Sequence, residues 1–166
     1  SDLEQLHDVL WNTGEAHGIV DFGLYAMNSL RMEKAYRSWG AELTNEVSMF
    51  EAGMTRFFSK TKMDFVGKVA TTEGASGAFQ LVYFEVDAID SDVRGGEPIF
   101  LGEDCIGVTT SGAYGYTVEK SLGFGYVCPD RAAPGSTFEV GLLDSRCGAT
   151  VLAEAAYDPS NQRLVD

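Results

Sequence analysis

The chain has 166 residues, of which 45% are hydrophobic and 22% charged, so it has the composition of a globular protein that can bury a core. Lys and Arg number 12 against 25 Asp and Glu, which gives a formal charge of −13. This charge disfavours nucleic acid and anionic membranes as partners, because both require a positive surface. No apolar run approaches the roughly 18 residues of a membrane span. We therefore expect a cytoplasmic protein, without nucleic-acid or membrane partners.

A first helix is predicted to begin directly after Asp2 and to end near Gly14, or at Gly18 at the latest. Leucines recur there at helical spacing behind a capping pattern of Asp2 and Gln5, and Gly14 is a suitable end. His7 lies on this helix, four residues after Leu3, which favours an imidazole at the edge of the core.

A second helix is predicted to begin at Asp21, whose carboxylate can accept hydrogen bonds from the first-turn N–H groups. Its expected buried face consists of Ala26, Met27 and Leu30.

Arg31 lies at the border of this apolar face and has two interpretations. Spacing favours a surface arginine whose stem covers the core. The alternative is a guanidinium that binds a carboxylate in a neighbouring cleft through two parallel N–H donors. Glu33 and Arg37, four residues apart, predict a surface ion pair.

The cysteines and histidines predict no metal site. Cys105, Cys128 and Cys147 have spacings unlike any metal motif, and the first two occur in strand-like runs where buried thiols are common. We expect three reduced cysteines and a reducing compartment.

Strand patterns replace helices in the second half of the chain. Six short strands are expected, and turn signals at regular spacing favour a small antiparallel β-barrel. A boundary within Thr71 to Gly77 divides the chain into residues 1–74 and 75–166, and the fold class is α+β. The expected strands are Phe79–Val86, Pro98–Leu101, Cys105–Thr110, Ser121–Val127, Phe138–Leu143 and Ala149–Ala155.

Several motifs then occur in one order along the chain: NSLRMEKAYRSWG, FEAGM, KMDFVGK, TTSGAYGYTVEKSLGFGYV and YDPSNQRL. In this series the chain resembles the C-terminal part of the aminomethyltransferase family, which includes the glycine-cleavage T-protein. It is most similar to the folate-binding C-terminal halves of dimethylglycine and sarcosine dehydrogenases. The resemblance covers roughly residues 15 to 165.

The resemblance implies transfer of a one-carbon unit from a methylated amine to tetrahydrofolate, giving 5,10-methylenetetrahydrofolate. Arg31 matches the arginine of the family's SLRLE motif and would orient folate. Tyr114, in a predicted polar turn from Thr109 that faces the family's central cavity, is a second folate-binding candidate, although a turn built for its own hydrogen bonds is an equal alternative. Arg56 is a third, at a position where relatives often have an aromatic residue.

The resemblance also implies that residues 1–74 are a remnant of the folate-binding α/β domain, followed by the family's barrel. The family's catalytic aspartate and YTGE motif are absent, so we expect no catalytic residue here and an inactive fragment of a longer protein. FAD would bind only in a missing N-terminal dehydrogenase half, and the partner would be that remainder or a dehydrogenase subunit. A eukaryotic source would place the protein in the mitochondrial matrix. The amine stays open, and a non-catalytic folate-binding or scaffold module is the alternative function.

Overall fold

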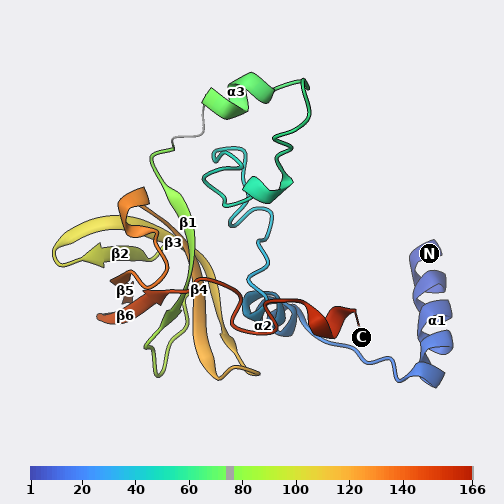
Figure 1. Ribbon diagram of the computed structural model, residues 1–166. Coiled ribbons are helices and arrows are strands. Elements are labelled where there is room, and N and C mark those ends of the chain that lie inside the picture. The colour runs from blue at the N-terminus through green and yellow to red at the C-terminus, as the bar shows by residue number, and fades with distance from the viewer. Residues whose placement is uncertain (74–76, 166) are drawn as a thin grey trace.

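The computed structural model describes residues 1–73 and 77–165, so the expected domain boundary at residues 74 and 75 lies outside the described residues. An N-terminal part with helices and irregular segments leads into a closed β-barrel (Figure 1). The helices are α1 (Asp2–Gly14), α2 (Leu24–Glu33) and α3 (Lys68–Glu73), with short 3-10 turns at Glu15–His17, Thr55–Phe57, Pro129–Arg131 and Gln162–Leu164. The strands are β1 (Gln80–Val86), β2 (Pro98–Leu101), β3 (Asp104–Gly115), β4 (Lys120–Val127), β5 (Thr137–Leu142) and β6 (Ser145–Val151).

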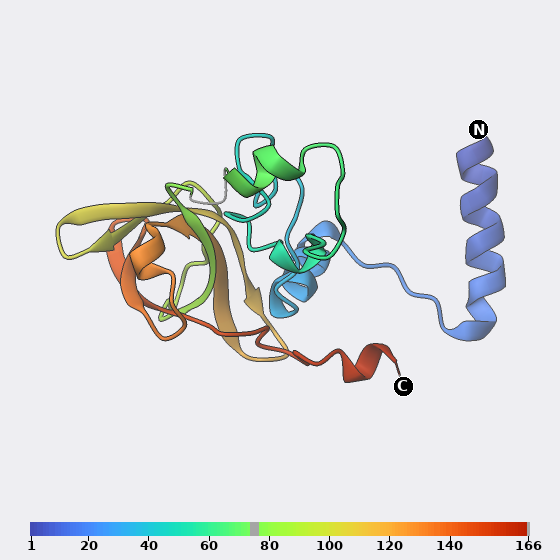
Figure 2. The same ribbon diagram turned by 45° about the horizontal axis from the view of Figure 1, so that its top comes forward.

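Helix α1 forms as predicted and ends at Gly14, although it begins one residue earlier, directly after Ser1. It buries none of its residues, and it stands apart from the barrel in Figures 1 and 2. His7 is exposed and stacks on Trp11, with 6.1 Å between ring centroids. The expectation of an imidazole at the edge of a core is therefore wrong. No helix of the described residues is long and apolar enough to cross a membrane.

Helix α2 packs on β3, but with a face other than the predicted one. It begins after Gly23, so Asp21 is not its N-cap residue, and Ala26, Met27 and Leu30 are exposed. The buried residues of α2 are Ser29, Met32 and Glu33.

Polar bonds to the barrel explain this orientation. Asn28 Nδ2 donates to the carbonyl of Gly112 at 3.0 Å, and Ser29 Oγ donates to the carbonyl of Tyr114 at 2.6 Å. These bonds fix the rotation of the helix, and the apolar stripe that sequence spacing selected faces away from β3.

The barrel confirms the predicted antiparallel architecture. Within the described residues, six strands close in the order β1-β4-β3-β2-β5-β6, and all their pairings are antiparallel. The predicted turn between β2 and β3 is present, with Gly102 in the left-handed region at φ 62°. Strand β6 begins four residues earlier than predicted, and β3 extends five residues further.

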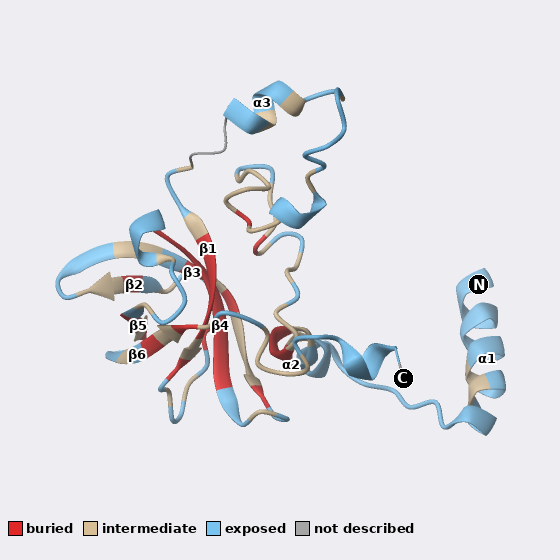
Figure 3. Cartoon of the chain, viewed as in Figure 1, coloured by how far each residue is buried: buried red, intermediate tan, exposed pale blue. Residues whose placement is uncertain are grey.

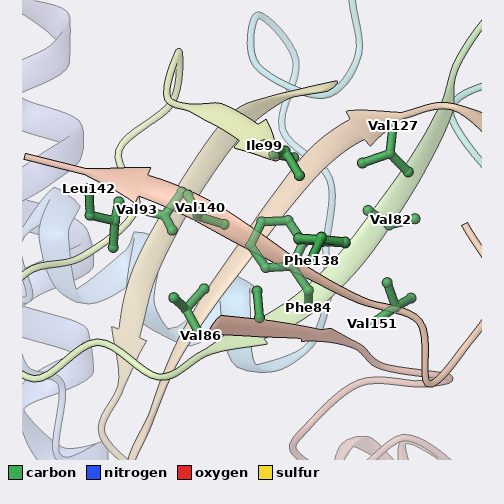
Figure 4. Close-up of a cluster of buried hydrophobic side chains, with 11 residues drawn as sticks. Val82, Phe84, Val86, Val93, Ile99, Val127, Phe138, Val140, Leu142 and Val151 are labelled. Carbon is green, nitrogen blue, oxygen red and sulfur yellow. The ribbon is translucent and has the colours of Figure 1, made fainter. Parts of the chain in front are cut away.

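Two apolar clusters explain why β1 and β4 are buried along nearly their whole length (Figure 3). One fills the barrel interior and includes Phe84 and Phe138, whose ring centroids lie 5.2 Å apart in an edge-on arrangement (Figure 4). The other joins Met32 of α2 to Tyr83 and Phe124 on the outer face of the barrel. The N-terminal part therefore covers one outer face of the sheet.

The segment that carries FEAGM is irregular, with turns and the short 3-10 helix at Thr55–Phe57. It is attached to the barrel where the Leu81 N–H donates to the carbonyl of Glu51 at 2.8 Å. This attachment places residues 49–57 beside the start of β1.

Replacement of Phe84 by alanine should destabilise the protein by about 3–5 kcal/mol, because the side chain is fully buried and its loss leaves a cavity in the barrel. The free energy of unfolding in urea measures this change. Phe22, exposed at 65%, is the control, and its alanine variant should change that free energy by less than about 0.5 kcal/mol. Equal effects of the two substitutions would contradict the placement of Phe84 in the core.

Candidate functional site

Arg31 lies in the last turn of α2, and the protein itself holds its guanidinium. Nε donates to Asn28 Oδ1 at 2.8 Å, and Nη1 donates to the carbonyl of Tyr36 at 3.2 Å and to Glu42 Oε2 at 3.0 Å. The side chain is only 15% exposed, so the surface-arginine interpretation is wrong. Among the described residues Nη2 has no acceptor, and this nitrogen is the part of Arg31 that a ligand could engage.

Glu42 is the residue that sequence reasoning missed. Its side chain is 0% exposed, and its carboxylate accepts four hydrogen bonds. Oε2 accepts from Arg31 and from the Ser38 N–H at 2.8 Å, while Oε1 accepts from Thr110 Oγ1 at 2.8 Å and from Ser111 Oγ. A buried carboxylate needs such a full set of donors. The only signal in the sequence was a motif of hydroxyl residues, Thr109 to Ser111, without an assigned acceptor.

That motif is not the predicted turn. It lies inside β3, with a register shift between Thr109 and Ser111 in the pairing with β4. The bulge brings the hydroxyls of Thr110 and Ser111 to the same carboxylate oxygen. Tyr114 lies further along β3, half-buried, with its ring edge-on to Tyr116 at 5.1 Å between centroids.

The predicted surface pair of Glu33 and Arg37 is also wrong. Glu33 is 2% exposed, and its Oε1 accepts from the Thr117 N–H at 2.6 Å. Arg37 Nε instead donates to the carbonyl of Ala52 at 2.7 Å. The helix ends at Glu33 and Ala35 has a positive φ of 52°, so residues 33 and 37 do not share a helical face.

A cavity of about 450 Å³ lies between the end of α2, the FEAGM segment, β1 and the C-terminal segment. We call it the basic cavity, because its lining includes Lys34, Arg37 and Arg56. Lys34 is neutralised by Asp158, with 3.1 Å between Nζ and Oδ2, and Nζ also donates to the Asp158 carbonyl at 2.6 Å. Arg56 is exposed and lies over the ring of Phe57, 4.7 Å from its centroid.

The three residues predicted to contact folate lie at three separate places. Arg56 lines the basic cavity, whereas Tyr114 lines a second cavity of about 540 Å³ together with Glu85 and Lys120. Arg31 lines neither of these two cavities. Within the described residues, no group of three His, Cys, Asp or Glu side chains could hold a metal ion. The three cysteines are free thiols, and Cys105 is exposed rather than buried.

Burial raises the pKa of Tyr126 to about 12, and the nearby carboxylates of Glu42 and Glu51 add to this shift. The Tyr126 hydroxyl donates to the backbone carbonyl of Glu42 at 2.7 Å. Burial likewise raises the pKa of Tyr83 to about 12, although the nearby backbone of Ala156 opposes it. Both hydroxyls are therefore protonated in the folded protein at neutral pH.

Comparison with known families identifies both parts of the chain. The family model for the glycine cleavage T-protein C-terminal barrel domain matches residues 80–158, and the model for the GCVT N-terminal domain matches residues 1–62. The chain belongs to the aminomethyltransferase family. The six-stranded barrel is the family's C-terminal barrel, and Arg31, Arg37 and Glu42 fall within the region matched by the N-terminal model.

Individual relatives agree with this family. Mouse mitochondrial dimethylglycine dehydrogenase is 38% identical over 98% of the chain, and an aminomethyltransferase of Corynebacterium aurimucosum is 33% identical over 95%. The chain spans 19% of the first relative and 43% of the second. The crystal structure of the glycine cleavage system aminomethyltransferase T from Bartonella henselae has the same fold, with a TM-score of 0.74 and 24% identity, covering 81% of this chain and 38% of that one.

Replacement of Glu42 by alanine should destabilise this aminomethyltransferase-family chain by about 3–5 kcal/mol, because Arg31 and two hydroxyls would lose a buried partner. Urea unfolding measures the loss. Glu46 is exposed four residues away, and its alanine variant is the matched control, expected to stay within about 0.5 kcal/mol. If both variants unfold at the same urea concentration, the role assigned to Glu42 is wrong.

Alkaline titration should reveal Tyr83 and Tyr126. Their folded-state pKa is raised to about 12 from an unfolded value near 10, so their contribution to stability is complete below pH 10 and is lost as the pH rises towards 12. Ultraviolet absorbance of phenolate should show two of the seven tyrosines ionising late. Tyr126→Phe should remove one late step, and titration of all seven near pH 10 by folded protein would refute the shifts.

Proposed function

We propose that the chain is the C-terminal part of a tetrahydrofolate-dependent one-carbon transferase of the dimethylglycine dehydrogenase kind. The observation that supports this most is the 38% identity with dimethylglycine dehydrogenase across 98% of the chain. In the proposed reaction, FAD in the remainder of the parent oxidises a methylated amine to an imine. The imine then loses its methylene carbon to the folate nitrogens, and the products are 5,10-methylenetetrahydrofolate and the demethylated amine. We propose that the amine substrate is a methylated amine of the kind of sarcosine and dimethylglycine.

Arg31 is the residue we propose to orient folate. Three protein acceptors fix its guanidinium, and the two N–H groups of Nη2 have no acceptor within the described part of the chain. A donor that is already held in place loses little conformational entropy when a ligand binds. Correct orientation of the reacting groups is a large part of enzyme catalysis. Tyr114 and Arg56 are further proposed contacts, each from its own cavity.

We propose that residues 1–74 and 75–166 belong to two domains, and that the remainder of a parent chain or a dehydrogenase subunit covers the exposed apolar surface of the first. Leu6, Leu10, Leu24 and Tyr25 are each more than half exposed, which is unusual for residues of this size in one region. In this proposal the segment is inactive alone, and FAD binds only in that remainder. For a eukaryotic source we propose the mitochondrial matrix, and otherwise the cytoplasm.

A folate-binding or scaffold module without catalysis is the second candidate. The observation that favours it is the separation of Arg31, Tyr114 and Arg56, which line no common cavity among the two described above. An assay of the full-length parent for 5,10-methylenetetrahydrofolate distinguishes the two candidates. Folate binding without product formation would favour the module.

Arg31→Lys should weaken tetrahydrofolate binding by the full-length parent about tenfold or more, because lysine keeps the charge beside Glu42 but lacks the second terminal nitrogen. Calorimetric titration measures the affinity. Arg94 is exposed and distant in sequence, and Arg94→Lys is the control. Equal affinities of the two variants would exclude Arg31 as a folate ligand.

A further inference from the structure

The basic cavity is lined by cations that differ in whether a carboxylate of the described residues neutralises them. Of its three cations, only Lys34 has a carboxylate partner among the described residues, whereas Arg37 and Arg56 have none. Glu154 also lines the cavity, but it makes no ion pair with either arginine. In a chain with 25 acidic and 12 basic residues, two unpaired guanidinium groups at one cavity are unexpected.

Arg37 is held so that part of its guanidinium stays available. Nε donates to the carbonyl of Ala52, and within the described residues Nη1 and Nη2 have no acceptor. The guanidinium lies over the ring of Phe124, with 5.9 Å between its carbon and the ring centroid. Gly53 has a positive φ of 65°, and a Cβ atom there would lie 2.8 Å from Nη2. Glycine at this position therefore keeps the space beside the free nitrogens open.

The surroundings of Arg37 favour a bound anion. Burial lowers the pKa of its guanidinium, and the charge of Arg56 lowers it further, while Tyr126 and Glu42 oppose these effects only in part. An anion beside both guanidinium groups would relieve the burial of an unpaired charge and the repulsion together. Tyr83 also lines the cavity, and its buried hydroxyl has no hydrogen-bond partner among the described residues.

We propose that the basic cavity binds the carboxylate of a small organic acid, with Arg37 as a two-pronged donor and Arg56 as a second cation. The planar arrangement of guanidinium N–H groups matches a carboxylate, and a cavity of about 450 Å³ is in the size range of small-molecule sites. The carboxylate could come from two sources: the glutamate end of tetrahydrofolate, or a free dicarboxylate. The site is distinct from Arg31, so it does not depend on the folate role proposed for that residue.

The test is calorimetric titration of the 166-residue chain with glutarate, which offers two carboxylates and no other recognition group. Arg37→Gln and Arg56→Gln should each weaken glutarate binding, Arg37→Gln by about tenfold or more. Arg94→Gln removes the same charge from an exposed position outside the cavity and should leave the affinity unchanged. Because Arg56 is exposed, Arg56→Gln keeps the test valid even if Arg37→Gln does not fold.

Competition identifies the source of the carboxylate. If tetrahydrofolate displaces glutarate but tetrahydropterin, which lacks the glutamate, does not, the site binds the glutamate end of the folate. If neither compound displaces glutarate, the site binds a free acid. Arg31→Lys should leave glutarate binding unchanged, so loss of the proposed folate role would not be confused with loss of this site. The proposal is overturned if the folded chain does not bind glutarate, if Arg94→Gln weakens binding as much as Arg56→Gln, or if inorganic phosphate binds more tightly than glutarate.

Discussion

The structure depends on the burial of one carboxylate. Glu42 lies between the end of α2 and the outer face of the barrel, where an unpaired charge would cost several kcal/mol. Arg31, a backbone N–H and two hydroxyls of β3 offset this cost, and Tyr126 of β4 bonds to the carbonyl of the same residue. Because these donors come from three segments, the carboxylate is satisfied in only one docked arrangement. The position of residues 31–42 on the barrel follows from this requirement.

The barrel was predictable because its strands have local signals. Alternation, proline and glycine positions and turn residues predicted six antiparallel strands, and the bounds of β2 agree with the prediction at both ends. The error in β3 has a physical cause. Thr109 to Gly112 have the polar composition of a turn, yet the hydroxyls of Thr110 and Ser111 donate to the Glu42 carboxylate, which is 68 residues away from Thr110 in sequence. Local composition does not reveal a partner so distant along the chain.

The helical part was less predictable because its packing is polar. Apolar spacing selected the face with Met27 and Leu30, whereas Asn28 and Ser29 fix the rotation of α2 through bonds to β3. The expected pair of Glu33 and Arg37 presupposed a helix that continues, but α2 ends at Glu33. The geometry of the candidate site was equally hard to predict from the sequence. The family motif identified Arg31, but the fold was needed to show that Glu42 holds its guanidinium and that Arg56 and Tyr114 line different cavities.

Three cations near the end of α2 show why a basic cluster in the sequence does not by itself locate a ligand. Arg31, Lys34 and Arg37 lie within seven residues of one another in the sequence, and the C-terminal end of a helix favours positive charge nearby. In the structure Arg31 pairs with a buried carboxylate and Lys34 pairs with Asp158, 124 residues later. Among the residues that the structure describes, Arg37 contacts a backbone carbonyl and an aromatic face but no carboxylate. The terminal nitrogens of Arg37 have no acceptor among the described residues. Since guanidinium groups bind carboxylates through two parallel hydrogen bonds, these three side chains differ in what each can still bind.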